Sequence, residues 1–334
     1  MIDFKTDKPI LSVGDACTDI ILPFGETRHM MAAHLQGETN HMGHNAANFF
    51  AGGSVANTAH GIAVLGGESW FAGKAGDDFF GRYLQSEFVK AGVDTRFMIL
   101  DEQIFTSMII VVVDENQERV NYAIPPHGGS QHLLEKHDLP DTLPDQIGWL
   151  HTSGILLREN PAADTILDFM DVCQRKGIPT SLDLNFRIEA IGNAQYVERI
   201  QRGIQLTNVL FGSGEEEMMP ITSAKTPQAA AKMLVGPNRM VVCRGGAQGA
   251  DIYLPDGNSL RGNAFDVPVV DTLGAGDAYN AGFIVAATEG HTMEEANRMG
   301  NAVSGFKIMH PGARNFPNRL QLEEFLAKYT VRTV

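Results

Sequence analysis

Short apolar runs typical of buried strands alternate with longer amphipathic stretches in the second half of the chain. The runs at 149–152, 180–184, 209–211 and 240–243 predict strands, and the stretches at 162–176, 194–207 and 226–234 predict helices. A hairpin is expected around 256–258, where the sequence is Asp-Gly-Asn. Strands that alternate with helices of this length form βαβ units, so this half predicts a mostly parallel sheet with helices on both faces.

The first half contains similar elements, interrupted by two stretches of different character. Strands are expected at 10–13 and 70–75, and helices at 56–65 and 79–91. The stretch 20–50 is rich in His and Met, whereas 105–126 contains two strand-like runs around a polar turn. We expect these two stretches to pair as a small β-sheet lid over the carboxyl edge of the main sheet, where ligands bind in open α/β sheets. The expected fold is a single three-layer α/β domain of residues 1–334 that carries this lid.

The composition excludes several classes of protein. The chain of 334 residues is 43% apolar, which excludes a disordered chain, and its longest apolar run, 108–113, is far short of the roughly 18 residues that span a membrane. The N-terminal segment lacks a basic stretch followed by an apolar core, so a cytoplasmic location is expected. With 26 Lys+Arg against 40 Asp+Glu the net charge is −14, and nucleic acid is not an expected partner without a basic stripe. The three cysteines are far apart and predict neither a disulfide framework nor a zinc ribbon.

The string DTLGAGD at 271–277 carries the clearest chemistry, because it precedes an apolar helix expected at 278–288. Backbone N–H groups and the helix dipole at such a glycine-rich start form an anion site. Asp277 then has two interpretations. It is either a charge that stabilises the first helical turn, or a base that accepts a hydroxyl proton during phosphoryl transfer.

Two other nucleotide-binding motifs are absent. A P-loop requires GxxxxGK[ST], but Gly73-Lys74 is followed by Ala75 and has Glu68 five residues before the glycine. No G-x-G-x-x-G string follows the strand expected at 10–13, so a dinucleotide-dependent dehydrogenase is disfavoured.

Three strings occur in the order AGGSVANTA at 51–59, GKAGDDFFG at 73–81 and DTLGAGD at 271–277. Together they resemble the signatures of the ribokinase (PfkB) family of carbohydrate and nucleoside kinases. The resemblance covers essentially the whole chain and implies the ribokinase-like three-layer fold. It also implies a sugar kinase that uses ATP and Mg²⁺.

The resemblance further implies roles around the acceptor hydroxyl. Asp277 would be the catalytic base, and the amides of Gly274, Ala275 and Gly276 would stabilise the charge of the migrating phosphoryl group. Substrate-binding roles are implied for Asp15, Asp19, Gly52, Gly53 and Asn57. Asp19 best matches the family's acceptor of sugar hydroxyls, which suits a carboxylate because it can accept two hydroxyls at once. The alternatives are that the two aspartates only solvate a strand end and that the glycines and Asn57 only start a helix.

Roles in nucleotide and metal binding follow from the same resemblance. The string VCRGGAQG at 242–249 resembles the strand and turn beneath ATP. ATP-binding roles are implied for Arg244, Gly246, Gly249, Asn301 and Ala302. The guanidinium of Arg244 is expected to bind phosphate oxygens, unless it is an ordinary surface arginine. Glu217 is expected to hold Mg²⁺ through water, with a solvated acidic helix start as the alternative, and Asp271 is a candidate for a K⁺ site of the kind found in some relatives.

The acceptor class is inferred from the string TSLDLNFR at 180–187. It resembles the D-x-N-[YF]-R string of 2-keto-3-deoxygluconate kinases and fructokinases, and Arg187 is expected to pair with a sugar-acid carboxylate. Only Tyr122 matches the Tyr-Arg pair of the ketodeoxygluconate kinase lid. We therefore expect phosphorylation of a primary hydroxyl of a small sugar or sugar acid that is 2-keto-3-deoxygluconate-, fructose- or ribose-like. An adenosine-type nucleoside kinase is the alternative, and a non-catalytic sugar or nucleotide sensor is a third.

Four histidines in the first lid stretch suggest a metal site at first sight. They are His29, His34, His41 and His44, whose spacing fits no closed zinc motif. A solvent-facing lid loop explains them better. The Met and Phe residues of this stretch are expected to pack the lid or to form a lid-to-lid contact, which leaves open a homodimer.

Overall fold

The computed structural model describes residues 3–23, 48–113, 119–125, 127–186 and 191–332. Its larger sheet has nine strands. In spatial order they are β13 (Ser259–Gly262), β12 (Ala250–Tyr253), β11 (Met240–Arg244), β10 (Val209–Ser213), β9 (Thr180–Asp183), β8 (Trp149–Ser153), β1 (Ile10–Val13), β4 (Ser69–Gly76) and β5 (Asp94–Asp101). The strands from β11 to β5 are parallel, and only β12 and β13 at one edge are antiparallel.

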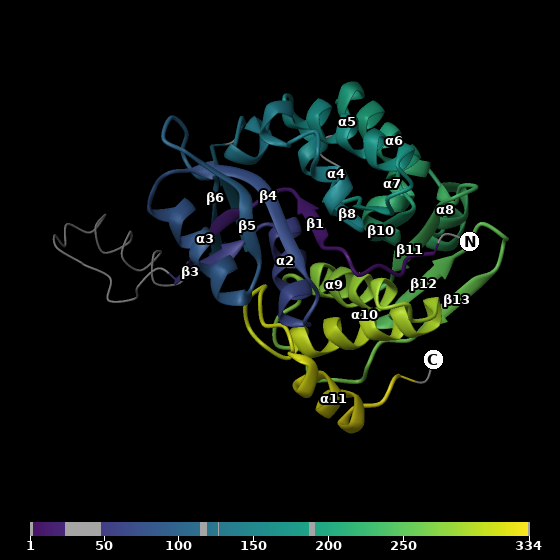
Figure 1. Cartoon of the computed structure of the whole chain (residues 1–334). Coiled ribbons are helices and arrows are strands. Elements are labelled where there is room, and N and C mark those ends of the chain that lie inside the picture. Colours follow the sequence, from purple (N-terminus) through teal and green to yellow (C-terminus); the bar gives the residue numbers. More distant parts are fainter. Residues whose placement is uncertain (1–2, 24–47, 114–118, 126, 187–190, 333–334) are drawn as a thin grey trace.

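Helices cover both faces of this sheet, which confirms the three-layer fold (Figure 1). The helices are α2 (Ser54–Val64), α3 (Phe79–Ala91), α4 (Leu143–Gln146), α5 (Ala162–Arg175), α6 (Ala194–Gln205), α7 (Met219–Thr222), α8 (Pro227–Leu234), α9 (Ala275–Thr288), α10 (Met293–Ile308) and α11 (Arg319–Lys328). Successive side chains of a strand point to opposite faces. In β11, accordingly, Val241 packs in the core beneath α5, α6 and α8, and Val242 in the core beneath α2, α9 and α10.

The smaller sheet has the strand order β3-β2-β6-β7, with β2 (Cys17–Pro23), β3 (Asn48–Gly52), β6 (Met108–Val113) and β7 (Arg119–Ile124). It contains the expected hairpin, since β6 and β7 are antiparallel. β2 and β6 are parallel neighbours although they are far apart in the sequence. In Figure 1 this sheet lies at the left, beside α3. The smaller sheet therefore combines strands from the two stretches that interrupted the alternation.

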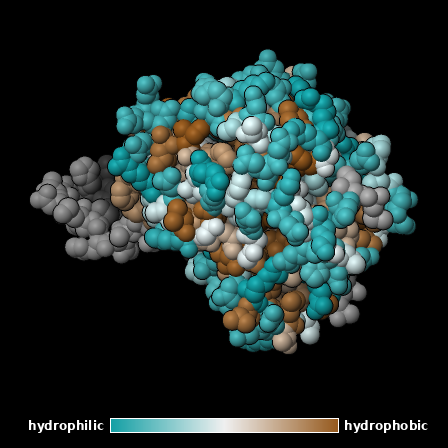
Figure 2. Space-filling model, in the orientation of Figure 1, coloured by the Kyte–Doolittle hydropathy of each residue, from teal (hydrophilic) through white to brown (hydrophobic). Residues whose placement is uncertain are grey.

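Two residues define the ends of α3. Asp78 caps the helix by accepting from the amide of Gly81, and Gly92 ends it in a left-handed conformation. The three cysteines are free. In the described part of the chain, no helix has the length and apolarity needed to cross a membrane. The face seen in Figure 2 is mostly hydrophilic, with hydrophobic residues in small scattered groups.

Candidate active site

A cavity of about 1510 Å³ opens at the carboxyl edge of the larger sheet. Residues at the ends of three of its strands line the cavity: Asp183 on β9, Ser213 on β10 and Arg244 on β11. Asp15, which follows β1, and the start of α9 line it as well. Carboxyl ends of parallel strands meet at one edge of a sheet, which is why residues so distant in the sequence lie in one site.

The turn before α9 is shaped by Gly274. Its φ of 76° is left-handed, and a Cβ there would lie 2.7 Å from the carbonyl oxygen of Ala313, so the turn requires glycine. Asp277 lies in the first turn of the helix, as predicted. The amide of Ala275 donates to the carbonyl oxygen of Thr272 at 3.1 Å, so it is already engaged. The amide of Gly276, within the first helical turn, has no acceptor inside the helix and is better placed to bind an anion.

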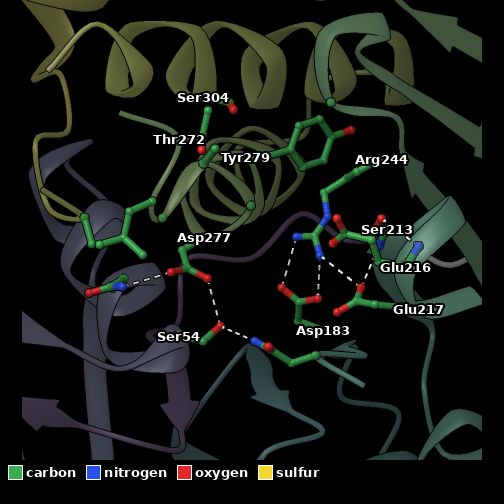
Figure 3. A pocket seen from close by; sticks show the side chains of 18 of the residues that line it. Ser54, Asp183, Ser213, Glu216, Glu217, Arg244, Thr272, Asp277, Tyr279 and Ser304 are labelled. Atoms are coloured by element: carbon green, nitrogen blue, oxygen red, sulfur yellow. Dashed lines mark hydrogen bonds and ion pairs between the residues drawn. The ribbon is translucent and has the colours of Figure 1, made fainter. Parts of the chain in front are cut away.

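Asp277 is buried, with 9% of its surface exposed, and two side chains donate to its carboxylate. Ser54 Oγ donates to Oδ1 at 2.8 Å and Asn57 Nδ2 donates to Oδ2 at 2.9 Å (Figure 3). Burial raises the pKa of Asp277 to about 7, which the two hydrogen bonds oppose and the nearby carboxylates of Asp183 and Asp15 reinforce. A carboxylate with such a pKa is suited to accept and release a proton near neutral pH.

The other residues that were predicted to bind the acceptor substrate differ in their contacts and positions. Asp15 accepts from the amides of Ser54 at 2.7 Å and Val55 at 3.3 Å, so its carboxylate anchors the start of α2 while it lines the cavity. Asp19 lies on β2 of the smaller sheet, and burial raises its pKa to about 6. Gly53 lines the cavity with a φ of 98°, whereas Gly52 is not among the lining residues and instead packs against Asp19.

Arg244 does not project freely toward the cavity. Its Nη2 and Nη1 donate to the two oxygens of Asp183 at 2.7 and 3.0 Å (Figure 3). Asn280 donates to the same carboxylate at 2.7 Å. Glu217 lies 3.7 Å from Arg244 and accepts from the amide of Ser213 at 2.6 Å. The guanidinium of Arg244 also lies close to Gly276, where an added Cβ would come within 2.8 Å of Nη1. The ion pair thus fixes a positive charge beside the turn at 274–277.

Gly246, Gly249 and Asn301, for which the resemblance implied ATP-binding roles, line the cavity on the side of β11 and α10. Ala302 is fully buried in the core and is not a lining residue. The expectation for Ala302 is therefore corrected, because successive residues of a helix lie about 100° apart and Asn301 and Ser304 occupy the cavity side of α10. Val269 and Val270, 58% and 62% exposed, add an apolar edge to this side of the cavity.

The surroundings of Asp271 do not fit a resident K⁺ ion. The amides of Leu273 and Gly312 each donate to its carboxylate at 2.9 Å. The buried ammonium of Lys307 donates to its main-chain carbonyl oxygen at 2.7 Å. A lysine ammonium and K⁺ would compete for that oxygen. Arg187 and the four histidines of the first lid stretch lie outside the described residues.

The sequence predicted no role for three residues of the site, Ser54, Asp183 and Asn185. Ser54 links Asp277 to Asn185, whose Nδ2 donates to Ser54 Oγ at 2.8 Å. Asn185 has a φ of 39°, a conformation that asparagine tolerates better than most residues. Asp183 and Asn185 belong to the same string as Arg187. Their place at the carboxyl end of an expected strand was the feature of the sequence that could have identified them as site residues.

The fold and the site define a ribokinase-like kinase. Residues 8–319 match the pfkB family of carbohydrate kinases, so the chain belongs to this family and is a sugar kinase. It is 33% identical over 240 residues to a fructokinase of Salmonella typhimurium, covering 70% of this chain and 76% of the relative. It is 26% identical to a 5-dehydro-2-deoxygluconokinase of Lacticaseibacillus casei, covering 85% and 89%. The aminoimidazole riboside kinase of Salmonella enterica, solved with aminoimidazole riboside and an ATP analogue, has a TM-score of 0.78 and 26% identity, covering 95% of this chain and 99% of that one.

Proposed function

We propose that this sugar kinase transfers the γ-phosphoryl group of ATP to a primary hydroxyl of a small sugar or sugar acid. The observation that carries the proposal is Asp277, a buried carboxylate with a pKa of about 7 at the N-terminus of a helix that faces the cavity. Asp277 removes the proton of the hydroxyl, and the resulting alkoxide attacks the γ-phosphorus as ADP leaves. The amides of the turn, above all that of Gly276, and the fixed charge of Arg244 stabilise the negative charge that spreads over the transferring group.

The acceptor sits between the turn and the smaller sheet in this proposal. Asp19 accepts hydroxyl hydrogen bonds, while Asn57 and Asn185 lie on the catalytic side of the cavity. Met108, Ile109, Ala123 and Ile124 of β6 and β7 line the same region. The smaller sheet therefore serves as a lid of the single domain that excludes water from the alkoxide.

In this proposal Mg²⁺ binds near the acidic residues beside Arg244, in the part of the cavity that holds ATP. Glu216 and Glu217 line the cavity beside Arg244 (Figure 3). Because Glu217 already accepts from Ser213 and lies near Arg244, it suits an ion held through water better than a direct ligand. When bound, Mg²⁺ offsets the charge of the ATP phosphates.

Six exposed apolar side chains lie on or beside the smaller sheet, and they support a homodimer through the lid. They are Phe49, Phe50, Phe79, Phe105, Tyr122 and Ile124, which are between 38% and 81% exposed. Isolated apolar residues are normal on a surface, but a group of this kind favours a protein contact. We propose such a homodimer, in the cytoplasm.

A panel of acceptors tests the substrate class. ADP formation is measured at fixed Mg²⁺ and ATP with fructose, ribose, 2-keto-3-deoxygluconate, 5-dehydro-2-deoxygluconate, adenosine and aminoimidazole riboside. We expect a sugar or sugar acid to give the highest kcat/KM. Adenosine or the riboside as the best acceptor would establish the nucleoside alternative, which the riboside kinase relative supports. Binding of a sugar without ADP formation from any acceptor would establish a sensor.

The ammonium of Lys307 leads to a prediction about K⁺. Since this fixed cation already binds the carbonyl oxygen of Asp271, we expect the rate to change by less than about two-fold when K⁺ is replaced by tetramethylammonium at constant ionic strength. The matched variant is Lys307→Met, in which K⁺ is expected to stimulate. A stimulation of the unmodified enzyme by K⁺ of about ten-fold or more would contradict the prediction and restore the K⁺ site at Asp271.

A further inference from the structure

Arg314 lies in the loop between α10 and α11 and is not among the residues that line the cavity. Its Nε donates to Asn57 Oδ1 at 2.9 Å and its Nη2 donates to the carbonyl oxygen of Gly52 at 3.0 Å. The guanidinium lies over the ring of Phe88, 5.1 Å from its centroid. Its Nη1 is buried and has no hydrogen-bond partner among the described residues. A surface arginine would not be held in this way.

The contact with Asn57 has a consequence for Asp277. An asparagine amide can face a neighbour with either its oxygen or its NH₂ group, whereas a guanidinium can only donate. The atom of Asn57 that faces Arg314 must therefore be the oxygen, and the NH₂ group is turned toward Asp277 Oδ2 at 2.9 Å. Without Arg314 the amide is free to rotate by half a turn. Its oxygen would then face the carboxylate, an arrangement that only a protonated Asp277 tolerates.

We propose that Arg314 is a positioning residue that fixes the amide orientation of Asn57 and thereby keeps Asp277 ionised as the base. The inference rests on the proposed role of Asp277. It also links the two halves of the acceptor site, because Gly52, whose carbonyl oxygen Arg314 binds, packs directly against the side chain of Asp19. Arg314 opposes the burial that raises the pKa of Asp19.

The charges around Asp277 show why a donor matters there. The carboxylates of Asp15, after β1, and Asp183, on β9, both favour the protonated form of Asp277. Arg244, on β11, is a positive charge close enough for Asp277 to raise the pKa of its guanidinium, and Asp183 holds that guanidinium. Only Asn57 and Ser54 donate hydrogen bonds to the carboxylate among the described side chains. Loss of the Asn57 donor therefore shifts the balance toward the protonated acid.

The test is the pH dependence of kcat/KM, which reports the ionisation of groups in the free enzyme. The unmodified enzyme should lose activity as the pH falls through about 7, because protonated Asp277 cannot accept the hydroxyl proton. This fall in activity at low pH is the acid limb of the profile. In Arg314→Leu we expect the midpoint of the acid limb to shift to higher pH by about one unit. Arg314→Lys keeps a donor toward Asn57 and should restore the original limb. Arg239→Leu is the matched control, since Arg239 also donates to two main-chain oxygens, those of Leu234 and Ile204, but lies away from the cavity.

A double mutant separates positioning from general loss of structure. In an Asn57→Ala background, Arg314→Leu should cause no further shift of the acid limb, because the group through which it acts is gone. If Arg314→Leu does not fold, Arg314→Gln replaces it, since a glutamine amide no longer enforces one orientation of Asn57 and should also raise the limb. An unchanged limb in the folded variant, or an equal shift with and without Asn57, would overturn the inference. Activity retained in Asp277→Asn would instead overturn the proposed function.

Discussion

Asp277→Asn is expected to lower kcat by about 10³-fold, the order of magnitude that a positioned general base contributes. An asparagine has nearly the shape of the aspartate and can still accept from Ser54, but its amide cannot take a proton from the acceptor hydroxyl. Because the substitution removes proton transfer rather than binding, KM should change much less than kcat. ADP formation with the best acceptor of the panel, measured under saturating ATP, gives both constants.

The matched control is Asp77→Asn, which also removes one carboxylate. Asp77 pairs with Arg82 at the start of α3, on an exposed surface, and is not a lining residue of the cavity. This variant should retain the kcat of the unmodified enzyme. Thermal unfolding of both variants shows whether they are folded. If Asp277→Asn keeps kcat within about ten-fold of the unmodified enzyme, another group or water must take the proton and the mechanism is wrong.

The alternation of strands and helices was predictable from the sequence because it depends on local patterns. The runs at 209–211 and 240–243 became β10 and β11, one or two residues longer at the carboxyl end. β5 was not predicted, because Asp94, Thr95 and Arg96 interrupt its apolar positions and its pairing with β4 decides the structure. The turn before α9 was predicted because all of its chemistry lies within one short string.

The side-chain partners across the site were not predictable in the same way. Arg244 lines the cavity, but the sequence did not predict its hydrogen bonds to Asn280 and to Asp183, which lies 61 residues earlier in the chain. β9 and β11 flank β10, so the carboxyl ends of the two strands lie close enough for a guanidinium to bridge them. That distance follows from the strand order, which a single sequence does not reveal. Arg314 was missed for the same reason, since it reaches Asn57 across 257 residues.

The Asp183–Arg244 pair is the basis of the second large expected effect, on stability. Asp183 is 2% exposed, and its two oxygens accept two hydrogen bonds from the guanidinium of Arg244 and one from Asn280. Asp183→Ala leaves the side chain of Arg244, itself only 16% exposed, without its main counter-charge. We expect the free energy of unfolding to fall by about 3 kcal/mol, the lower end for a broken buried pair, because the cavity admits water to the guanidinium. Urea unfolding, followed by fluorescence or circular dichroism, measures the change.

The double variant Asp183→Leu with Arg244→Met shows whether the cost comes from the unpaired charge or from lost packing. Replacing both members of a buried ion pair by apolar residues is often neutral, whereas removing one member is costly. The double variant should therefore be more stable than Asp183→Ala, even though it lacks both charges. It should also lose activity, since the fixed positive charge beside Gly276 is gone. Equal stability of Asp183→Ala and the unmodified enzyme would mean that Glu217, 3.7 Å from the guanidinium, is a sufficient partner for Arg244.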